Sequence, residues 1–242
     1  MHTRSSKSVK FTLYLLGLMG WSLTSSAQSQ IIKVISKTTI HRQQVLKDSN
    51  NRMVELRTVM PSLVYDLRYA TRNNFTGKTL YKSGMQTYLR LPVATALQRV
   101  QETLAKQNLG LKIYDAYRPF KVTKKMWELI GDERYVANPA KGSGHNRGTS
   151  VDVTIIQLST GEEVDMGTGF DAFSDTAHHG FAHLQPEVTR NREMLRAAME
   201  LHGFVALKTE WWHYTWSQAQ RFDPLDLSFQ ELQRLSNRSK RY

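Results

Sequence analysis

Apolar residues along this chain change repeatedly between helical and strand-like spacing. Four of them, spaced three or four apart, predict a helix over residues 92–108, because such positions share one helical face. Pro92 at the first helical position and Gly110 just beyond the end support these boundaries. The same spacing predicts helices over residues 121–130 and 192–202, and each is expected to bury its apolar face.

Strands are predicted where β-branched and aromatic residues cluster. Short apolar runs on both sides of Pro61 indicate strands, and a loop rich in turn residues follows over 69–77. The later predicted strands cover 111–115, 151–156, 204–207 and 209–216. Ser228 and Glu231 have the spacing of a capping box, which predicts a short last helix. Because helices and strands do not alternate regularly, we expect a single α+β domain with a central antiparallel sheet flanked by helices.

The first 27 residues have the pattern of an export signal. Basic residues precede an apolar run over 11–23, and small residues ending at Ala27 follow it. The run is shorter than the roughly 20 residues that a membrane-spanning helix needs, so we expect cleavage, export to the periplasm and no stable membrane insertion. Residues 28–52 are polar without a clear period, which favours a flexible lead-in, and the folded domain is expected over 53–242.

Composition narrows the chemistry of this domain. The 242 residues include no cysteine, so a metal would have to be bound by nitrogen and oxygen ligands. The formal net charge is +12, and part of the excess lies near the C-terminus. A solvated end is the simpler explanation of that charge, and attraction to an anionic envelope is the alternative. Nucleic acid is not an expected partner, since the sequence contains no recognition-helix or aromatic-platform motif.

Two short segments contain the parts of a catalytic metal site. His145 and Asp152 are separated by a stretch that includes Gly148, so a turn can fold the imidazole over the strand that bears the carboxylate; alone, such a pair is more typical of a surface loop. Glu210 and His213 lie three apart in an aromatic run, and in a strand they would need a bulge or twist to reach one metal. An aromatic strand with an incidental polar pair is the alternative. Together, the segments supply two imidazoles, a carboxylate ligand and a spare carboxylate, the set that a catalytic zinc requires.

The order of several motifs resembles one family. Ser-x-His-x-x-Gly-x-x-x-Asp over 143–152, Glu-x-x-His over 210–213 and Tyr-Arg-Pro over 117–119 resemble the D-alanyl-D-alanine dipeptidases of the VanX type, zinc D,D-peptidases of family M15. Further stretches match at 69–77, 165–171 and 178–179. The resemblance covers most of residues 53–216. It implies the D,D-carboxypeptidase/hedgehog-like fold, with residues 53–242 as the zinc dipeptidase catalytic domain.

The resemblance also implies the metal site and the reaction. His145, Asp152 and His213 would bind one zinc ion per chain, and Glu210 would be the catalytic base that takes a proton from the metal-bound water. The implied reaction is hydrolysis of the small dipeptide D-Ala-D-Ala to two D-alanines. The alternatives are a D,D-carboxypeptidase or endopeptidase that trims peptidoglycan stem peptides, and a non-catalytic zinc-bearing module that binds the envelope. The oligomeric state stays open.

Further implied roles concern the transition state and the substrate. Arg118 corresponds to the arginine placed against the tetrahedral intermediate, although a structural ion pair with Asp115 is the alternative. Tyr69 and Asp171 would meet the free amine of the dipeptide. Ser143 and its loop would meet the carboxylate or the backbone of the substrate.

Three further features bear on the site: a residue that differs from some relatives, a pair of additional histidines and a shortened loop. Gly144 stands where some relatives carry a second serine, so another donor has to replace that hydroxyl if it binds the substrate carboxylate. His178 and His179 match a family pair, but a structural or supporting role is expected because three ligands already complete the site. The loop over 131–142 is also shorter than in some relatives, which predicts a reshaped entrance.

Overall fold

The computed structural model describes residues 32–82, 84 and 86–239. The predicted export signal over residues 1–27 lies outside this part of the chain. None of the helices in the described part combines the length and the apolar character that crossing a membrane requires.

A five-stranded sheet forms the centre of the described domain, with its strands in the order β2-β4-β5-β7-β6. The strands are β2 (Val64–Tyr65), β4 (Leu109–Asp115), β5 (Ser150–Gln157), β6 (Phe204–Ala206) and β7 (His213–Trp216). Neighbours among β4, β5, β7 and β6 pair antiparallel, as expected, whereas β2 pairs parallel to β4. A long crossover through a helix connects β2 to β4, which permits the parallel pairing. A separate small sheet pairs β1 (Met53–Glu55) with β3 (Tyr88–Arg90).

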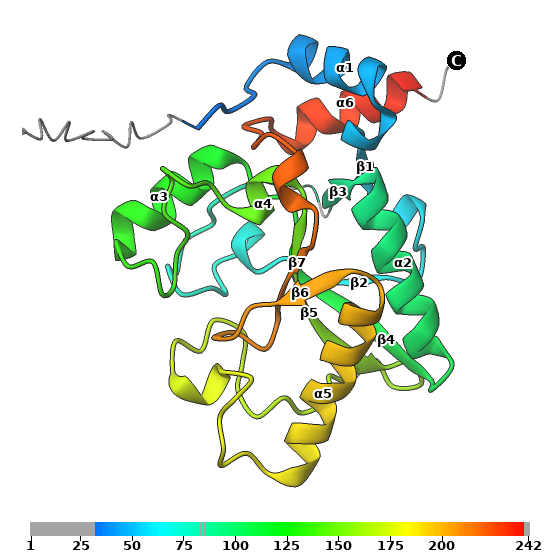
Figure 1. The fold of residues 1–242 in the computed structure, drawn as a ribbon, viewed down its shortest axis with the longest axis vertical. Helices are drawn as coiled ribbons and strands as arrows, with labels where there is room; N and C mark the ends of the chain where they lie inside the picture. The colour runs from blue at the N-terminus through cyan, green and yellow to red at the C-terminus, as the bar shows by residue number, and fades with distance from the viewer. Residues whose placement is uncertain (1–31, 83, 85, 240–242) are drawn as a thin grey trace, which may run out of the picture. The chain divides into compact units, whose positions relative to one another are not determined.

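Helices cover the sheet on two sides. The α-helices are α1 (Thr38–Lys47), α2 (Leu91–Ala105), α3 (Phe120–Ile130), α4 (Gly144–Arg147), α5 (Pro186–Leu201) and α6 (Phe229–Ser239). Short 3-10 turns are η1 (Ser49–Asn51), η2 (Leu56–Thr58), η3 (Arg68–Ala70), η4 (Asp175–Ala177) and η5 (Ala219–Arg221). Figure 1 shows α2 and α5 on one side of the sheet and α3 and α4 on the other. The main apolar core lies between α2, α5 and the sheet, and the residues discussed below lie on the α4 side.

The predicted helices correspond to α2, α3 and α5, and the capping box is present. The Ser228 N–H donates to Glu231 Oε2 at 2.8 Å, and the Glu231 N–H donates to Ser228 Oγ at 3.3 Å, at the start of α6. α5 begins at Pro186 rather than near residue 192, because its first turns are largely polar and carry little apolar period. Helix periodicity therefore located the elements better than their ends.

The end of α2 differs from the prediction. Asn108 adopts the left-handed conformation, with φ of 58°, and ends the turn that follows α2. β4 then begins at Leu109, so Gly110 is a strand residue and not a helix cap. A Cβ at Gly110 would lie 2.7 Å from Leu158 Cδ2, so a larger residue there would have to displace this exposed leucine side chain.

The folded part begins before Met53, within the segment expected to be a flexible lead-in. The Ile35 N–H donates to Pro224 O at 2.8 Å, and Ile35 is buried. α1 follows, and His41 is its buried residue, with 3% of its surface exposed. A helix that buries one histidine has no apolar stripe, so the sequence carried no signal for it. Contacts with the C-terminal segment, such as the 2.7 Å hydrogen bond from Gln44 Nε2 to Asp223 Oδ2, hold it in place.

The predicted strand over 209–216 is divided into a turn and a strand. β7 begins at His213, and the preceding residues form turns in which the Glu210 N–H donates to Leu207 O at 3.2 Å. Trp211 and Trp212 are each 1% exposed, so the aromatic run anchors a turn in the core. Glu210 therefore precedes the strand, so the alternation of side chains between the two faces of the strand does not apply to it. No bulge is needed to bring it towards His213.

Candidate active site

One cavity of about 230 Å³ collects the residues that the sequence analysis singled out. Its lining includes Tyr69, Arg118, Ser143, His145, Asp152, Asp171, Glu210 and His213. These residues come from loops, two short helical segments and two strands, and they extend from residue 69 to residue 213. The fold thus places all eight around one space.

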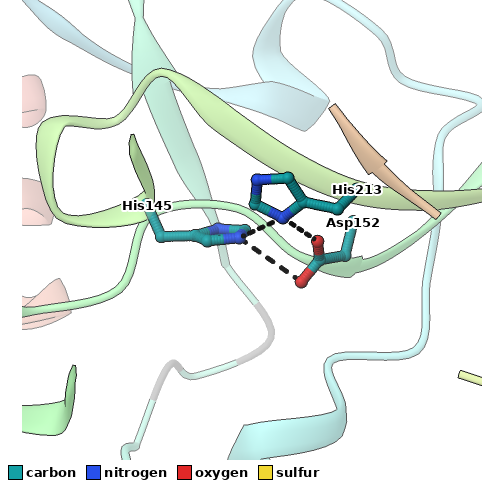
Figure 2. Close-up of side chains that lie close together, drawn as sticks. All are labelled: His145, Asp152 and His213. Carbon is teal, nitrogen blue, oxygen red and sulfur yellow. Dashed lines mark hydrogen bonds and ion pairs between the residues drawn. The ribbon is translucent and has the colours of Figure 1, made fainter. Parts of the chain in front are cut away.

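His145, Asp152 and His213 form a ligand group, in which their polar atoms point at one another (Figure 2). His213 Nδ1 is 2.8 Å from Asp152 Oδ1 and 3.2 Å from His145 Nε2, and His145 Nε2 is 3.4 Å from Asp152 Oδ2. One ligand atom from each residue lies within 4.8 Å of the others. Two imidazole nitrogens and one carboxylate converging at this distance are the donor set of a catalytic zinc site, which keeps a further position for water. The residues present therefore fit a metal ion.

Burial and hydrogen bonds prepare these groups for a cation. Burial by itself would raise the pKa of the Asp152 carboxyl, but the charges and hydrogen bonds of His145 and His213 hold that pKa below its usual range. His145 Nδ1 lies 2.7 Å from Ala116 O. A carbonyl can only accept, so Nδ1 carries the hydrogen and Nε2 presents its lone pair to the ligand group.

The local sequence around His145 explains its position. Ser143 caps the short helix α4, with the His145 N–H donating to Ser143 Oγ at 3.2 Å and the Ser143 N–H donating to Asn146 Oδ1 at 3.0 Å. Gly148 ends α4 in the left-handed conformation, with φ of 70°. A Cβ there would lie 2.7 Å from Met53 Cε, so glycine satisfies both the turn and the packing.

Strand register brings the other two ligands together. Asp152 on β5 is the direct antiparallel partner of His213 on β7. On the opposite edge of β5, a register shift between Ile113 and Asp115 in β4 places Asp115 opposite Asp152. The sequence analysis did not expect this irregularity in β4, which brings a second carboxylate close to the site.

Glu210 lies at the edge of the ligand group. Its Oε2 is 4.0 Å from His213 Nδ1, and burial raises the pKa of its carboxyl to about 7. A carboxylate with a pKa near neutrality, beside a potential metal ligand, is suited to accept and return a proton.

Arg118 forms the ion pair with Asp115 that was weighed as its structural role, and it also lines the cavity. Its Nε donates to Asp115 Oδ2 at 2.8 Å and its Nη2 lies 2.7 Å from the same oxygen, while Asp152 Oδ2 is 3.9 Å from Nη2. Burial alone would lower the pKa of the guanidinium, but Asp115 and its neighbours raise it above its ordinary value, so Arg118 stays charged. Asp115 was missed by sequence reasoning as a site residue. It is fully buried, and it also accepts a 2.6 Å hydrogen bond from Tyr81.

Tyr69 and Asp171 form the acidic end of the cavity. The Tyr69 hydroxyl is 3.0 Å from both Asp171 oxygens, and the Arg118 guanidinium lies 4.8 Å from the Tyr69 ring centre. Asp171 has a positive φ of 59°, a strained conformation for a residue other than glycine. Burial, followed by the nearby Asp152, raises the pKa of the Asp171 carboxyl well above its ordinary value. The positive charge of Arg118 lowers this pKa, but by less than burial and Asp152 raise it.

An aromatic rim, consisting of Phe75, Tyr135 and Phe173, lies next to the acidic end. The Phe75 and Phe173 ring centres are 5.2 Å apart, and those of Tyr135 and Phe173 are 4.6 Å apart. Tyr69 contacts Phe75 edge to face at 6.1 Å. Each member of the rim comes from a different loop, so sequence spacing contained no signal for the group.

His178 and His179 stand outside the ligand group, as expected. His179 packs against Tyr214 with ring centres 6.2 Å apart, and burial lowers the pKa of its imidazole to about 4. His178 lies 3.7 Å from Asp175 through Nε2 and lines a smaller cavity that shares Glu210 with the main one. Among the described residues, the group of potential metal ligands consists of His145, Asp152 and His213.

Comparisons with known proteins show which family the chain resembles. A model of the Peptidase_M15 family, described as D-ala-D-ala dipeptidase, matches residues 49–234. A D-alanyl-D-alanine dipeptidase of Escherichia coli (strain K12) is 36% identical over 170 residues, which cover 70% of this chain and 87% of that protein. One of Enterococcus faecium is 34% identical over 172 residues, covering 62% and 84%.

Two solved structures also match parts of the chain. The LdcB LD-carboxypeptidase aligns with a TM-score of 0.36 at 18% identity, covering 61% of this chain and 69% of that one. A variant of the vancomycin resistance D,D-pentapeptidase VanY aligns with a TM-score of 0.36 at 15% identity, covering 62% and 85%. The sequence matches are the stronger finding.

Proposed function

The chain belongs to the Peptidase_M15 family of D-Ala-D-Ala dipeptidases, and we propose that it hydrolyses D-Ala-D-Ala to two D-alanines with one zinc ion and a water molecule. The observation that carries this proposal is the single cavity that contains a three-ligand group, a buried glutamate and an acidic end. His145, Asp152 and His213 would hold the zinc. The ion would supply a Lewis acid that polarises the peptide carbonyl and lowers the pKa of bound water to about 7.

Glu210 is proposed as the general base. Its carboxylate takes a proton from the attacking water and delivers it to the leaving amine of the second D-alanine. A pKa near 7 keeps both protonation states accessible at neutral pH, which a group that first accepts and then donates requires.

Arg118 is proposed to stabilise the oxyanion of the tetrahedral intermediate. The ion pair with Asp115 leaves the guanidinium in a fixed orientation against the cavity wall. A donor held in place before the reaction does not need to reorganise when negative charge develops. The structural ion pair is therefore part of the proposed catalytic role, because it positions the donor.

The two ends of the dipeptide are proposed to meet different groups. An ammonium beside Tyr69 and Asp171 would add a positive charge next to the buried Asp171 carboxyl and favour its ionised form. Ser143 Oγ already accepts from the His145 N–H, so its own hydrogen is available for a carboxylate or carbonyl oxygen of the substrate. We propose that the aromatic rim beside the acidic end obstructs residues that precede the dipeptide, which would favour a dipeptidase over an enzyme that trims longer peptides.

The proposal is tested with the purified protein and a substrate panel. D-Ala-D-Ala should be cleaved, and L-Ala-L-Ala and a tripeptide that ends in D-Ala-D-Ala should be cleaved much more slowly. A chelator should abolish the activity and zinc should restore it. Glu210→Ala should lose hydrolysis, whereas Glu187→Ala, an exposed glutamate on α5, should not.

Each rival predicts a different result. Undiminished hydrolysis by Glu210→Ala would refute the proposed mechanism. Equal cleavage of dipeptide and tripeptide would indicate a D,D-carboxypeptidase, and zinc binding without hydrolysis of any peptide would indicate a non-catalytic module.

Export to the periplasm is proposed from the sequence pattern of residues 1–27. Expression in a Gram-negative host should yield a periplasmic protein whose first residue is Gln28. A cytoplasmic protein that retains Met1 would contradict the proposal.

A further inference from the structure

A pair of hydroxyl groups lies directly beside the ligand group. On β5 and β7, Asp152 pairs with His213, and two residues away Ser150 pairs with Thr215. Residues two apart on a strand face the same side, so the hydroxyl pair lies on the face that carries the two ligands. Ser150 Oγ is 2.6 Å from Thr215 Oγ1, and Thr215 Oγ1 is 3.2 Å from His213 Nε2. The hydroxyls thus reach the ring nitrogen of His213 that faces away from the ligand group.

Gly144 is adapted to this pair. A Cβ at position 144 would lie 1.9 Å from Ser150 Oγ and 3.4 Å from Thr215 Cγ2. Gly144 has no positive φ, so backbone conformation does not require glycine there. The close approach of α4 to the hydroxyl pair does. The volume that a serine side chain would occupy at this position is filled by the Ser150 hydroxyl.

The direction of the hydrogen bonds decides whether His213 can bind a metal. A neutral imidazole has a hydrogen on one nitrogen and a lone pair on the other. If Nε2–H donates to Thr215 Oγ1, then Nδ1 presents its lone pair to the ligand group. If the Thr215 hydroxyl instead donates to Nε2, the hydrogen is on Nδ1 and the ligand atom is blocked.

The Ser150 hydroxyl can select between these states. When Thr215 donates its hydrogen to Ser150 Oγ, its oxygen is left as an acceptor for Nε2–H. His145 needs no such relay, because its orienting partner is the carbonyl of Ala116, which can only accept. The hydroxyl of a threonine beside His213 can both donate and accept a hydrogen bond, so a second group must set the direction of its hydrogen bond to His213.

We propose that Thr215 and Ser150 are positioning residues that hold His213 in the tautomer and ring orientation required for the metal, and that Gly144 provides the space for this relay. The inference rests on the proposed zinc-dependent function. The relay acts through His213 and touches neither the substrate nor the attacking water.

The test measures zinc affinity, by competition with a chromophoric chelator, in the full-length protein. Loss of an orienting hydrogen bond to a ligating histidine typically costs about 10- to 100-fold in metal affinity, so Thr215→Val should weaken zinc binding by that factor. Thr215→Ser should restore it, because the hydroxyl is kept. Ser150→Ala should weaken binding while leaving Thr215 in place.

Two further variants complete the design. Thr154→Val makes the same change on β5, two residues after Asp152, whereas Ser150 lies two residues before it. This variant should keep wild-type zinc affinity. Gly144→Ala should weaken zinc binding by displacing the Ser150 hydroxyl. The loss in Gly144→Ala/Ser150→Ala should be smaller than the combined single losses, since both substitutions remove the same acceptor. Thermal unfolding of the metal-free proteins shows which variants are folded.

The outcomes separate this inference from the proposed function. Wild-type affinity in folded Thr215→Val, or failure of Thr215→Ser to restore affinity, would overturn the positioning role. Independent losses in the Gly144 and Ser150 variants would overturn the role of Gly144. Glu210→Ala should bind zinc normally and lose hydrolysis. A wild-type protein that neither binds zinc nor cleaves D-Ala-D-Ala would instead refute the proposed function.

Discussion

Replacing Glu210 with glutamine should slow the enzyme and stabilise the metal-free fold at the same time. The glutamine keeps the size of the side chain but removes the group proposed to move protons. General acid-base catalysis contributes about 10²- to 10⁴-fold, so kcat for D-Ala-D-Ala should fall by that factor, with zinc still bound.

The stability gain follows from the burial of the carboxyl. Its pKa is about 7 in the folded protein against 4.5 as the ordinary value. The folded state therefore binds the proton more tightly than the unfolded state, and the free energy of unfolding falls as pH rises from 4.5 towards 7. A pKa difference of this size corresponds to about 3 kcal/mol above pH 7. Glutamine does not ionise, so Glu210→Gln should be up to about 3 kcal/mol more stable than the wild type at pH 8 and similar to it below pH 4.5.

Urea unfolding of the two metal-free proteins at several pH values between 4.5 and 8 measures this difference. The gap should open with rising pH, and zinc should reduce it, because a nearby cation favours the ionised carboxylate. Parallel pH dependences in the two proteins would show that burial does not destabilise the carboxylate. A stabilised variant with unchanged kcat would refute the role of Glu210 as the base.

Three further predictions concern other residues. Arg118→Ala should lower kcat/KM by about 10²- to 10³-fold in steady-state kinetics, and unchanged kcat/KM would contradict the oxyanion role. The variant should also unfold at a lower urea concentration, because Asp115 loses its buried partner. Asp171→Asn should raise KM for D-Ala-D-Ala and leave zinc affinity unchanged, and an unaltered KM would contradict amine recognition. Burial, aided by Arg90, lowers the pKa of His41 to about 4 against 6.5 as the ordinary value, so this residue costs the protein stability as pH falls from 6.5 to 4. His41→Leu should flatten that part of the stability profile in urea unfolding, and an unchanged slope would show that His41 is not buried as a neutral group.

The predictable part of the site was local in sequence. The short motifs with fixed spacing contain His145, Asp152, Glu210 and His213, and the family model matches the stretch that contains them. Asp115 did not stand out, because its importance depends on a register shift in β4 and on a hydrogen bond from Tyr81. Neither depends on a pattern within a few residues of Asp115.

The part of the fold that could be predicted also followed from local sequence patterns. α2 and α3 have apolar periods, and they were placed to within a few residues. α1 has no such period, so only its contacts with the C-terminal segment reveal that residues before Met53 are folded. The apolar pattern reports a side chain's burial only where a whole face of an element is buried.

The sequence by itself determined the α+β class, the main helices and strands, the candidate metal ligands and the family, because periodicity and motif spacing are properties of neighbouring residues. Tertiary structure decided how these parts act together. It turned the chain before β7 so that Glu210 reaches the ligand group, paired Asp152 with His213, and assembled the aromatic rim from three loops. It also explains why position 144 is a glycine, since the Ser150 hydroxyl occupies the space that a side chain at this position would need. Contacts of this kind join residues that are distant in sequence, and only the folded backbone brings them within reach of one another.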